Sequence, residues 1–166
     1  MRRRSTRRGG AVAVEAALVL PLVLILLMGT WEVGRFVLVG QILNTAAREG
    51  ARLAAGGYTT NNTPVTAAMV QQAVQDYMTA AGLPSAAVTG STVTINCLAS
   101  TSWTDPYNAQ PLDPFQVVLT IPAGTAFNAL RWNLLPRLTS ITQLQVTVEW
   151  YSLNNSQVVV GTSLPY

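Results

Sequence analysis

The most regular feature of the chain is an apolar stretch near its N-terminus. Between Ala11 and Trp31 the only charged residue is Glu15. A helix needs about 20 mostly apolar residues to cross the hydrocarbon core of a bilayer. The pattern therefore predicts a membrane-spanning helix over residues 11 to about 31. It contains Pro21, which membrane helices tolerate when neighbouring groups satisfy the freed carbonyl.

The helical pattern continues beyond this span. Apolar residues recur on one face of the following segment, and the first clear stop signal is Gly56-Gly57, so one helix over residues 11–57 is predicted. Two acid–arginine pairs at i,i+3 spacing, Glu32–Arg35 and Glu49–Arg52, support its outer half.

Small residues form two rows with a spacing of four in the outer part of this helix. One row is Ala46, Gly50 and Ala54, and the other is Ala47, Ala51 and Ala55. Such rows allow the close approach of another helix during assembly, or of the chain's own sheet. Both interpretations stay open at the level of the sequence.

Residues 58–166 have the patterns of a mixed domain. A second helix is predicted with Thr63 as its cap, Pro64 in its first turn and its end before Gly82; its apolar positions are Val65, Met69, Ala73 and Tyr77. Segments rich in Val, Ile and Thr predict three or four antiparallel strands, at residues 91–99, 115–123, 144–152 and 157–163. A short helix or loop is expected over residues 126–138. The predicted fold class is α+β, a long N-terminal helix leading into a domain with a second helix and this sheet.

Charge is concentrated at the N-terminus. Residues 1–10 hold five of the ten arginines and no acid, although only 10% of the whole chain is charged and 49% is hydrophobic. The positive-inside rule keeps this basic leader in the cytoplasm and places residues 58–166 outside, which predicts a single-pass protein of the cytoplasmic membrane. After residue 10 the acids outnumber the arginines, so no nucleic-acid-binding face is predicted.

The chain offers little material for catalysis. It has no histidine and one cysteine, Cys97, so no catalytic triad, ordinary zinc site or intrachain disulfide is available, and we predict no enzyme activity, metal or cofactor. Asp105 and Asp113 each precede a proline, which favours turn chemistry over a carboxylate pair or a calcium site. Trp103 and Tyr107 in the same loop are candidates for an exposed contact surface, or for a cover over the sheet.

The N-terminal residues resemble a type IV prepilin processing site. A basic leader ends in Gly10, Ala11 follows, and Glu15 is the fifth residue after the glycine, at the start of a long apolar helix. The resemblance implies that a membrane-embedded prepilin peptidase cuts between Gly10 and Ala11. A cut after Gly9 would instead make Glu15 the sixth residue.

The segment from Gly10 to about Gly57 is similar to the TadE-like proteins of the tight-adherence (Flp) pilus system. The features that carry the similarity are the glutamate with its alanines, Pro21, the Gly34-Arg35 pair and the run of residues 46–52. The major Flp pilin usually has an aromatic residue where this chain has Ala16, and a domain of more than a hundred residues follows here. The resemblance is therefore to a minor pilin or pseudopilin.

This resemblance implies a role in pilus biogenesis and surface adhesion, with possible sites of helix assembly at Glu15, Pro21 and the small residues of the two rows. The implied partners are the prepilin peptidase, other major or minor pilins, the inner-membrane assembly platform and membrane lipid. After cleavage, the α-amine of Ala11 and the Glu15 carboxylate of a neighbouring subunit can neutralise each other; the alternative is that Glu15 only extends toward the headgroups near the leader. A different class of function is an uncleaved, signal-anchored extracytoplasmic binding domain that does not assemble.

Overall fold

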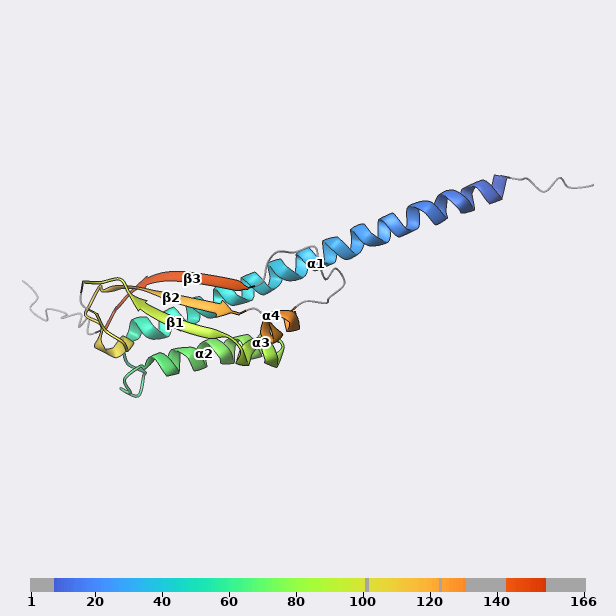
Figure 1. Cartoon of the computed structure of the whole chain (residues 1–166). Helices are drawn as coiled ribbons and strands as arrows, with labels where there is room; N and C mark the ends of the chain where they lie inside the picture. The colour runs from blue at the N-terminus through green and yellow to red at the C-terminus, as the bar shows by residue number, and fades with distance from the viewer. Residues whose placement is uncertain (1–7, 101, 123, 131–142, 155–166) are drawn as a thin grey trace, which may run out of the picture. The chain divides into compact units, whose positions relative to one another are not determined.

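The computed structural model describes residues 8–100, 102–122, 124–130 and 143–154 of the 166-residue chain. It confirms the α+β class (Figure 1). In chain order, the elements are α1 (Arg8–Gly56), α2 (Ala67–Ala80), α3 (Ser85–Thr89), β1 (Thr92–Cys97), the 3-10 helix η1 (Pro106–Asn108), β2 (Pro114–Ile121), α4 (Thr125–Leu130) and β3 (Leu144–Tyr151).

The chain divides into two compact units between Leu38 and Val39. The first unit holds the N-terminal part of α1. The second unit begins at Val39 and holds the remainder of α1 together with the other helices and the sheet. The last part of the long helix is therefore built into the domain and does not merely lead to it.

Among the described residues, three strands form the sheet of the second unit. Their order is β1-β2-β3, and both neighbouring pairs are antiparallel. Val117 of β2 lies between Ile95 and Val148, whereas the next residue, Val118, lies between Thr94 and Thr147. This alternation gives the sheet one apolar face and one mostly polar face, as expected when a single face of an antiparallel sheet packs on a core.

The helices of the second unit supply the other side of the core. At one end, Leu43 and Ala47 of α1 meet Val74 and Met78 of α2 in a buried cluster that includes Leu119 of β2. Toward the end of α1, a second cluster joins its alanines to α2 and to the middle of β2; its buried members are Ala51, Ala54, Ala55, Val65, Val70, Phe115 and Val117. Helices α1 and α2 thus share the apolar face of the sheet.

The end of α1 has the geometry that the two glycines predicted. Gly57 follows the last helical residue with φ +65°, a left-handed conformation that glycine adopts without strain from a side chain. Its N–H donates to the Ala54 carbonyl at 3.2 Å, and its own carbonyl accepts from the Val65 N–H at 2.9 Å. The helix is therefore stopped and tied to the segment that leads into α2.

The start and the apolar face of α2 differ from the prediction. The cap is Thr66, whose side chain accepts from the Met69 N–H at 3.4 Å, and not Thr63. Thr63 belongs instead to the preceding turn, where its carbonyl accepts from Thr59, and Pro64 pairs with Tyr58 in an isolated bridge.

The buried positions of α2 are Val70, Val74 and Met78, one residue later than the predicted Met69, Ala73 and Tyr77. Both series have the same helical spacing, so the spacing alone does not choose between them. The partner surface decides, because Val70 and Val74 meet the bare backbone of α1 at Gly50.

The predicted strands at residues 91–99, 115–123 and 144–152 correspond to β1, β2 and β3. Helix α4 occupies the first part of the segment expected to be a short helix or loop, and α3 is an additional helix that the sequence pattern did not indicate. The possible fourth strand at residues 157–163 lies outside the described residues.

Candidate functional site

The N-terminal part of α1 exposes its apolar side chains along its length. Val14, Leu18, Leu22, Ile25 and Leu26 are among many exposed large hydrophobic residues there. By length and composition, α1 is able to cross a membrane, and the most apolar part of it has no share buried inside the structure. Exposed apolar surface of this extent marks contact with a membrane or with partner helices.

Gly10 and Glu15 both lie on the described part of α1, and both are exposed. The helix begins at Arg8, before the predicted processing point and three residues earlier than predicted. A Cβ at Gly10 would meet no heavy atom within 4 Å. Each glycine inside a helix is less favourable than alanine by about 1 kcal/mol. The pair Gly9-Gly10 therefore lowers the free energy needed to unwind the helix at this point.

Glu15 lies four residues after Ala11, one helical turn along the same face. Pro21 lies farther along, within the same continuous helix. The processing role of Gly10 and Ala11 and the assembly role of Glu15 and Pro21 stay predictions.

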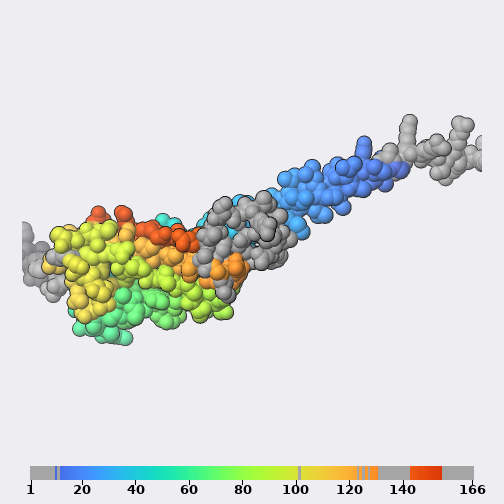
Figure 2. Space-filling view, viewed as in Figure 1, coloured from blue at the N-terminus to red at the C-terminus, as the bar shows by residue number. Residues whose placement is uncertain are grey.

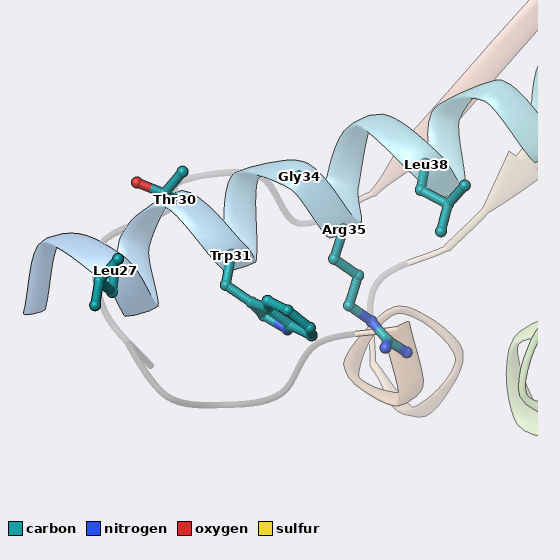
Figure 3. A pocket seen from close by; sticks show the side chains of 6 residues that line it. All are labelled: Leu27, Thr30, Trp31, Gly34, Arg35 and Leu38. Atoms are coloured by element: carbon teal, nitrogen blue, oxygen red, sulfur yellow. The ribbon is translucent and has the colours of Figure 1, made fainter. Parts of the chain in front are cut away.

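A groove of about 500 Å³ runs along α1 where its apolar stretch ends. It is lined by Leu27, Thr30, Trp31, Gly34, Arg35 and Leu38 (Figure 3). Trp31 and Arg35 project from the same side of the helix, one turn apart. The Thr30 hydroxyl donates to the Leu26 carbonyl at 2.9 Å and is thereby satisfied within the helix. Aromatic and arginine side chains beside an apolar span are typical of a membrane–water boundary.

The rows of small residues serve packing within the second unit. Ala46, Ala47, Ala51 and Ala54 are buried with at most 1% of their surface exposed. Gly50 lies in the same region, where an added Cβ would stand 2.5 Å from Cγ2 of Val74. Of the two interpretations left open by the sequence, the structure shows intramolecular packing, and it leaves these five residues no free surface for another helix.

The predicted ion pair between Glu49 and Arg52 is formed on the outer part of α1. Arg52 Nε donates to Glu49 Oε2 at 3.0 Å, and a second guanidinium nitrogen contacts Oε1. The side-chain hydrogen bond from Arg52 lowers the pKa of the Glu49 carboxyl below its ordinary value. For Glu32, in contrast, Oε2 is buried without a hydrogen-bond partner in the described part of the chain.

The aspartates of the 102–113 loop are both engaged by the backbone. Asp105 Oδ1 accepts from the Ala67 N–H at 2.9 Å, at the first turn of α2, and Asp113 Oδ2 accepts from the Gln110 N–H at 2.8 Å. Among the described residues, no group of three or more His, Cys, Asp or Glu side chains is placed to hold a metal. The two carboxylates fix the loop and the start of α2, in line with the turn chemistry that the sequence favoured.

Trp103 and Tyr107 occupy different surroundings. The Trp103 ring is partly buried and meets the Phe115 ring edge-to-face, with centroids 5.9 Å apart, so it covers the end of the core. Tyr107 is also partly buried, and its N–H donates to the Val65 carbonyl at 3.3 Å. Cys97 ends strand β1, partly buried and opposite Phe115 of β2.

Asn154 is a structural residue that the sequence pattern did not reveal. It follows β3 and is 6% exposed, and its amide donates to the Tyr107 carbonyl at 2.7 Å and the Ala109 carbonyl at 3.0 Å. Gly57 packs directly against its carboxamide. An asparagine after a strand has no local signature for such a role, because its partners lie far away in the sequence.

A comparison with known protein families gave a match within α1. The sequence model of the TadE-like protein family matches residues 10–52, which confirms the resemblance for this part of the chain. The match therefore covers the exposed apolar part of α1 and most of the part built into the second unit. Comparisons with curated proteins and with solved structures gave no match.

Proposed function

We propose that this protein is a membrane-inserted minor pilin or pseudopilin of a tight-adherence pilus system, acting through assembly and not through catalysis. The observation that carries the proposal is the TadE-like match over residues 10–52. This match falls on a helix that exposes many large apolar side chains between Val12 and Leu38. A helix of this kind needs either lipid or other helices around it.

The first step of the proposed function is insertion and processing. The arginine leader stays in the cytoplasm, and residues beyond the span are carried outward. A prepilin peptidase then cleaves between Gly10 and Ala11. The adjacent glycines support this step, because a helical turn that contains Gly9-Gly10 unwinds more readily than the alanine- and leucine-rich helix behind it.

The second step is assembly through the helix. Cleavage leaves an α-ammonium group on Ala11 near the Glu15 carboxylate, and an ionised carboxylate inside an apolar slab is unfavourable by about 2.5–3.5 kcal/mol. Pairing the amine with the carboxylate of a neighbouring subunit neutralises both groups when the helices pack. Pro21, Gly34 and Arg35 all belong to the first unit, on the same helix as Glu15.

The partners of this function are the prepilin peptidase, other pilins, the inner-membrane assembly platform and the surrounding lipid. The second unit, which begins at Val39, is carried on the helix into or onto the pilus, or into its initiating complex, and supports surface adhesion there. Because the last turns of α1 belong to the buried clusters of that unit, forces on the helix would be transmitted to the sheet through these contacts.

The test is the intact mass and N-terminal sequence of the protein recovered from membranes of strains with and without their own prepilin peptidase. The expected product begins at Ala11 only when the peptidase is present. Gly10→Ala should block cleavage, whereas Gly9→Ala, its matched control, should leave the site after Gly10 intact. If the leader is retained in both strains, the processing step is wrong.

Assembly is tested separately with Glu15→Gln, and Glu49→Gln on the same helix serves as the control. Glu49 contacts Arg52 within its own chain, so its loss should leave pilus formation unchanged. Glu15→Gln should reduce recovery of the protein with sheared filaments while its level in the membrane stays constant. Equal filament association of both variants would remove Glu15 from the assembly mechanism.

The second candidate function is an anchored binding domain that keeps its leader. The observation that favours it is that α1 is helical from Arg8 through Gly10 without a break, which leaves the predicted cleavage site in a helix. A retained leader together with normal membrane insertion would select this function. Filament association of a processed protein would eliminate it.

A further inference from the structure

A second hollow lies at the end of the domain where α1 finishes. It has a volume of about 680 Å³, and its walls come from three separate parts of the chain: residues 56–62, the 107–111 loop and Asn154. In Figure 2 the segment that leads into α2 and the yellow loop around residues 100–112 meet on the surface at this end of the domain. Loops gathered at one end of a rigid scaffold are a common location for binding sites.

Hydrogen bonds join the three segments that line this hollow. The buried Asn154 amide joins the carbonyls of Tyr107 and Ala109, and the Leu153 N–H donates to the Ala55 carbonyl at 2.8 Å. Gly57 is held against the Asn154 side chain. The three segments are therefore preorganised, and a ligand would not have to order them on binding.

The side chains that face the hollow are polar but uncharged. Its described lining contains Tyr58 and Tyr107, the amides of Asn62 and Gln110, and no Asp, Glu, Lys or Arg. Asn154 also lines it, but its amide N–H groups already donate to the Tyr107 and Ala109 carbonyls. Among the described residues, a charged ligand would find no opposite charge there, and transfer of an unpaired charge out of water is strongly unfavourable. Amide groups both donate and accept hydrogen bonds, and tyrosine combines an apolar ring with a polar hydroxyl.

We propose that this hollow binds a short neutral saccharide. Sugars present hydroxyl groups that match the amides and phenols, and apolar C–H faces that match the tyrosine rings. The volume falls within the range of about 300–1,000 Å³ that small-molecule sites occupy. The site belongs to the second unit alone, so it would serve a pilus subunit and an anchored domain equally.

The experiment is saturation-transfer NMR with the full chain in an amine-oxide detergent, which has no sugar headgroup. The probes are maltotriose, cellotriose and triacetylchitotriose, with a proline-rich peptide as a competitor. At least one trisaccharide should bind. Tyr58→Ala and Gln110→Ala should each weaken that binding about tenfold, a difference of about 1.4 kcal/mol.

Both substitutions suit the test because they leave the core untouched. Tyr58 is 45% exposed and its pairing with Pro64 uses only the backbone, while Gln110 is also exposed. Tyr151→Ala is the control, since this tyrosine is 60% exposed on β3 and does not line the hollow. The proposal is overturned if none of the three saccharides binds, if the Tyr58 and Gln110 variants bind as well as the control, or if the peptide displaces the sugar and binds more tightly.

Discussion

The close packing of α1 on α2 predicts opposite effects for one substitution at two glycines of the same helix. A Cβ at Gly50 would lie 2.5 Å from Cγ2 of Val74 and 3.3 Å from Cγ1 of Val70, whereas a Cβ at Gly40 would meet no heavy atom within 4 Å. Both glycines lie inside α1, so alanine improves helix propensity at each by about 1 kcal/mol. The difference between the two variants therefore measures the packing alone.

The neighbouring side chain at Gly50 has little freedom to move. Val74 is fully buried, and a β-branched residue in a helix has one strongly preferred rotamer. Alanine at Gly50 must push the helices apart or force Val74 from its rotamer, and overpacking of this kind typically costs about 1–3 kcal/mol. Allowing for propensity, we expect Gly50→Ala to lower the free energy of unfolding by about 0–2 kcal/mol and Gly40→Ala to raise it by about 0.5–1 kcal/mol.

The measurement is urea unfolding of the full chain in detergent micelles, followed by near-ultraviolet circular dichroism. Combining Val74→Ala with Gly50→Ala removes the methyl group that clashes, so a double-mutant cycle should show a coupling of about 1–2 kcal/mol between the two positions. If Gly50→Ala stabilises the protein as much as Gly40→Ala does, the helices are not in close contact at this point and the reasoning fails.

Three further predictions concern the ends of helices and one ion pair. Gly57→Ala should destabilise the domain by more than Gly82→Ala. Both positions have positive φ, which costs about 1–2 kcal/mol for alanine, but only the Cβ at position 57 would also lie 2.5 Å from Asn154. Equal losses of stability in urea unfolding would contradict this prediction. Asp105→Ala should lower the free energy of unfolding by about 0.5–2 kcal/mol through loss of the acceptor for the Ala67 N–H. Asp105→Asn keeps an acceptor oxygen and should retain most of this stability. If Asp105→Asn is as unstable as Asp105→Ala, the carboxylate has a different role. The Glu49–Arg52 pair should give a small stabilisation at neutral pH that disappears as the pH falls through the lowered pKa of Glu49. Unfolding curves of the unaltered chain and of Glu49→Gln should therefore differ at pH 7 and converge in acid. A difference that stays constant with pH would show that the ion pair does not cause it.

The parts of the fold that the sequence predicted are those with a strong local pattern. The apolar stretch and the stop at Gly56-Gly57 define α1, and runs of Val, Ile and Thr define three strands, because each pattern reflects the contacts of its own element. The face of α2 was displaced by one residue since two apolar series fit the same spacing, and only the position of Gly50 on another helix selects one of them.

The candidate sites show the same limit. Gly10 and Glu15 were found because a processing motif is local, and their roles stay predictions until a partner is observed. The sequence left two options for Trp103 and for the small residues of α1, and tertiary packing decided both in favour of the core. The hollow at the end of α1 was not foreseen, because it joins Tyr58, the 107–111 loop and Asn154, which share no pattern along the chain.

The contact between the end of α1 and the residues after β3 also bears on how the chain folds during synthesis. The Ala55 carbonyl is made early, but its partner, the Leu153 N–H, is made near the end of the described chain, and the β2 residues that pack with the helix are made only after α2 and β1. Until then the inner face of the helix is not covered by the sheet. That face is composed largely of alanine and glycine, which present little apolar area to water. The small side chains that later allow tight packing therefore also limit aggregation through this face while the chain is incomplete.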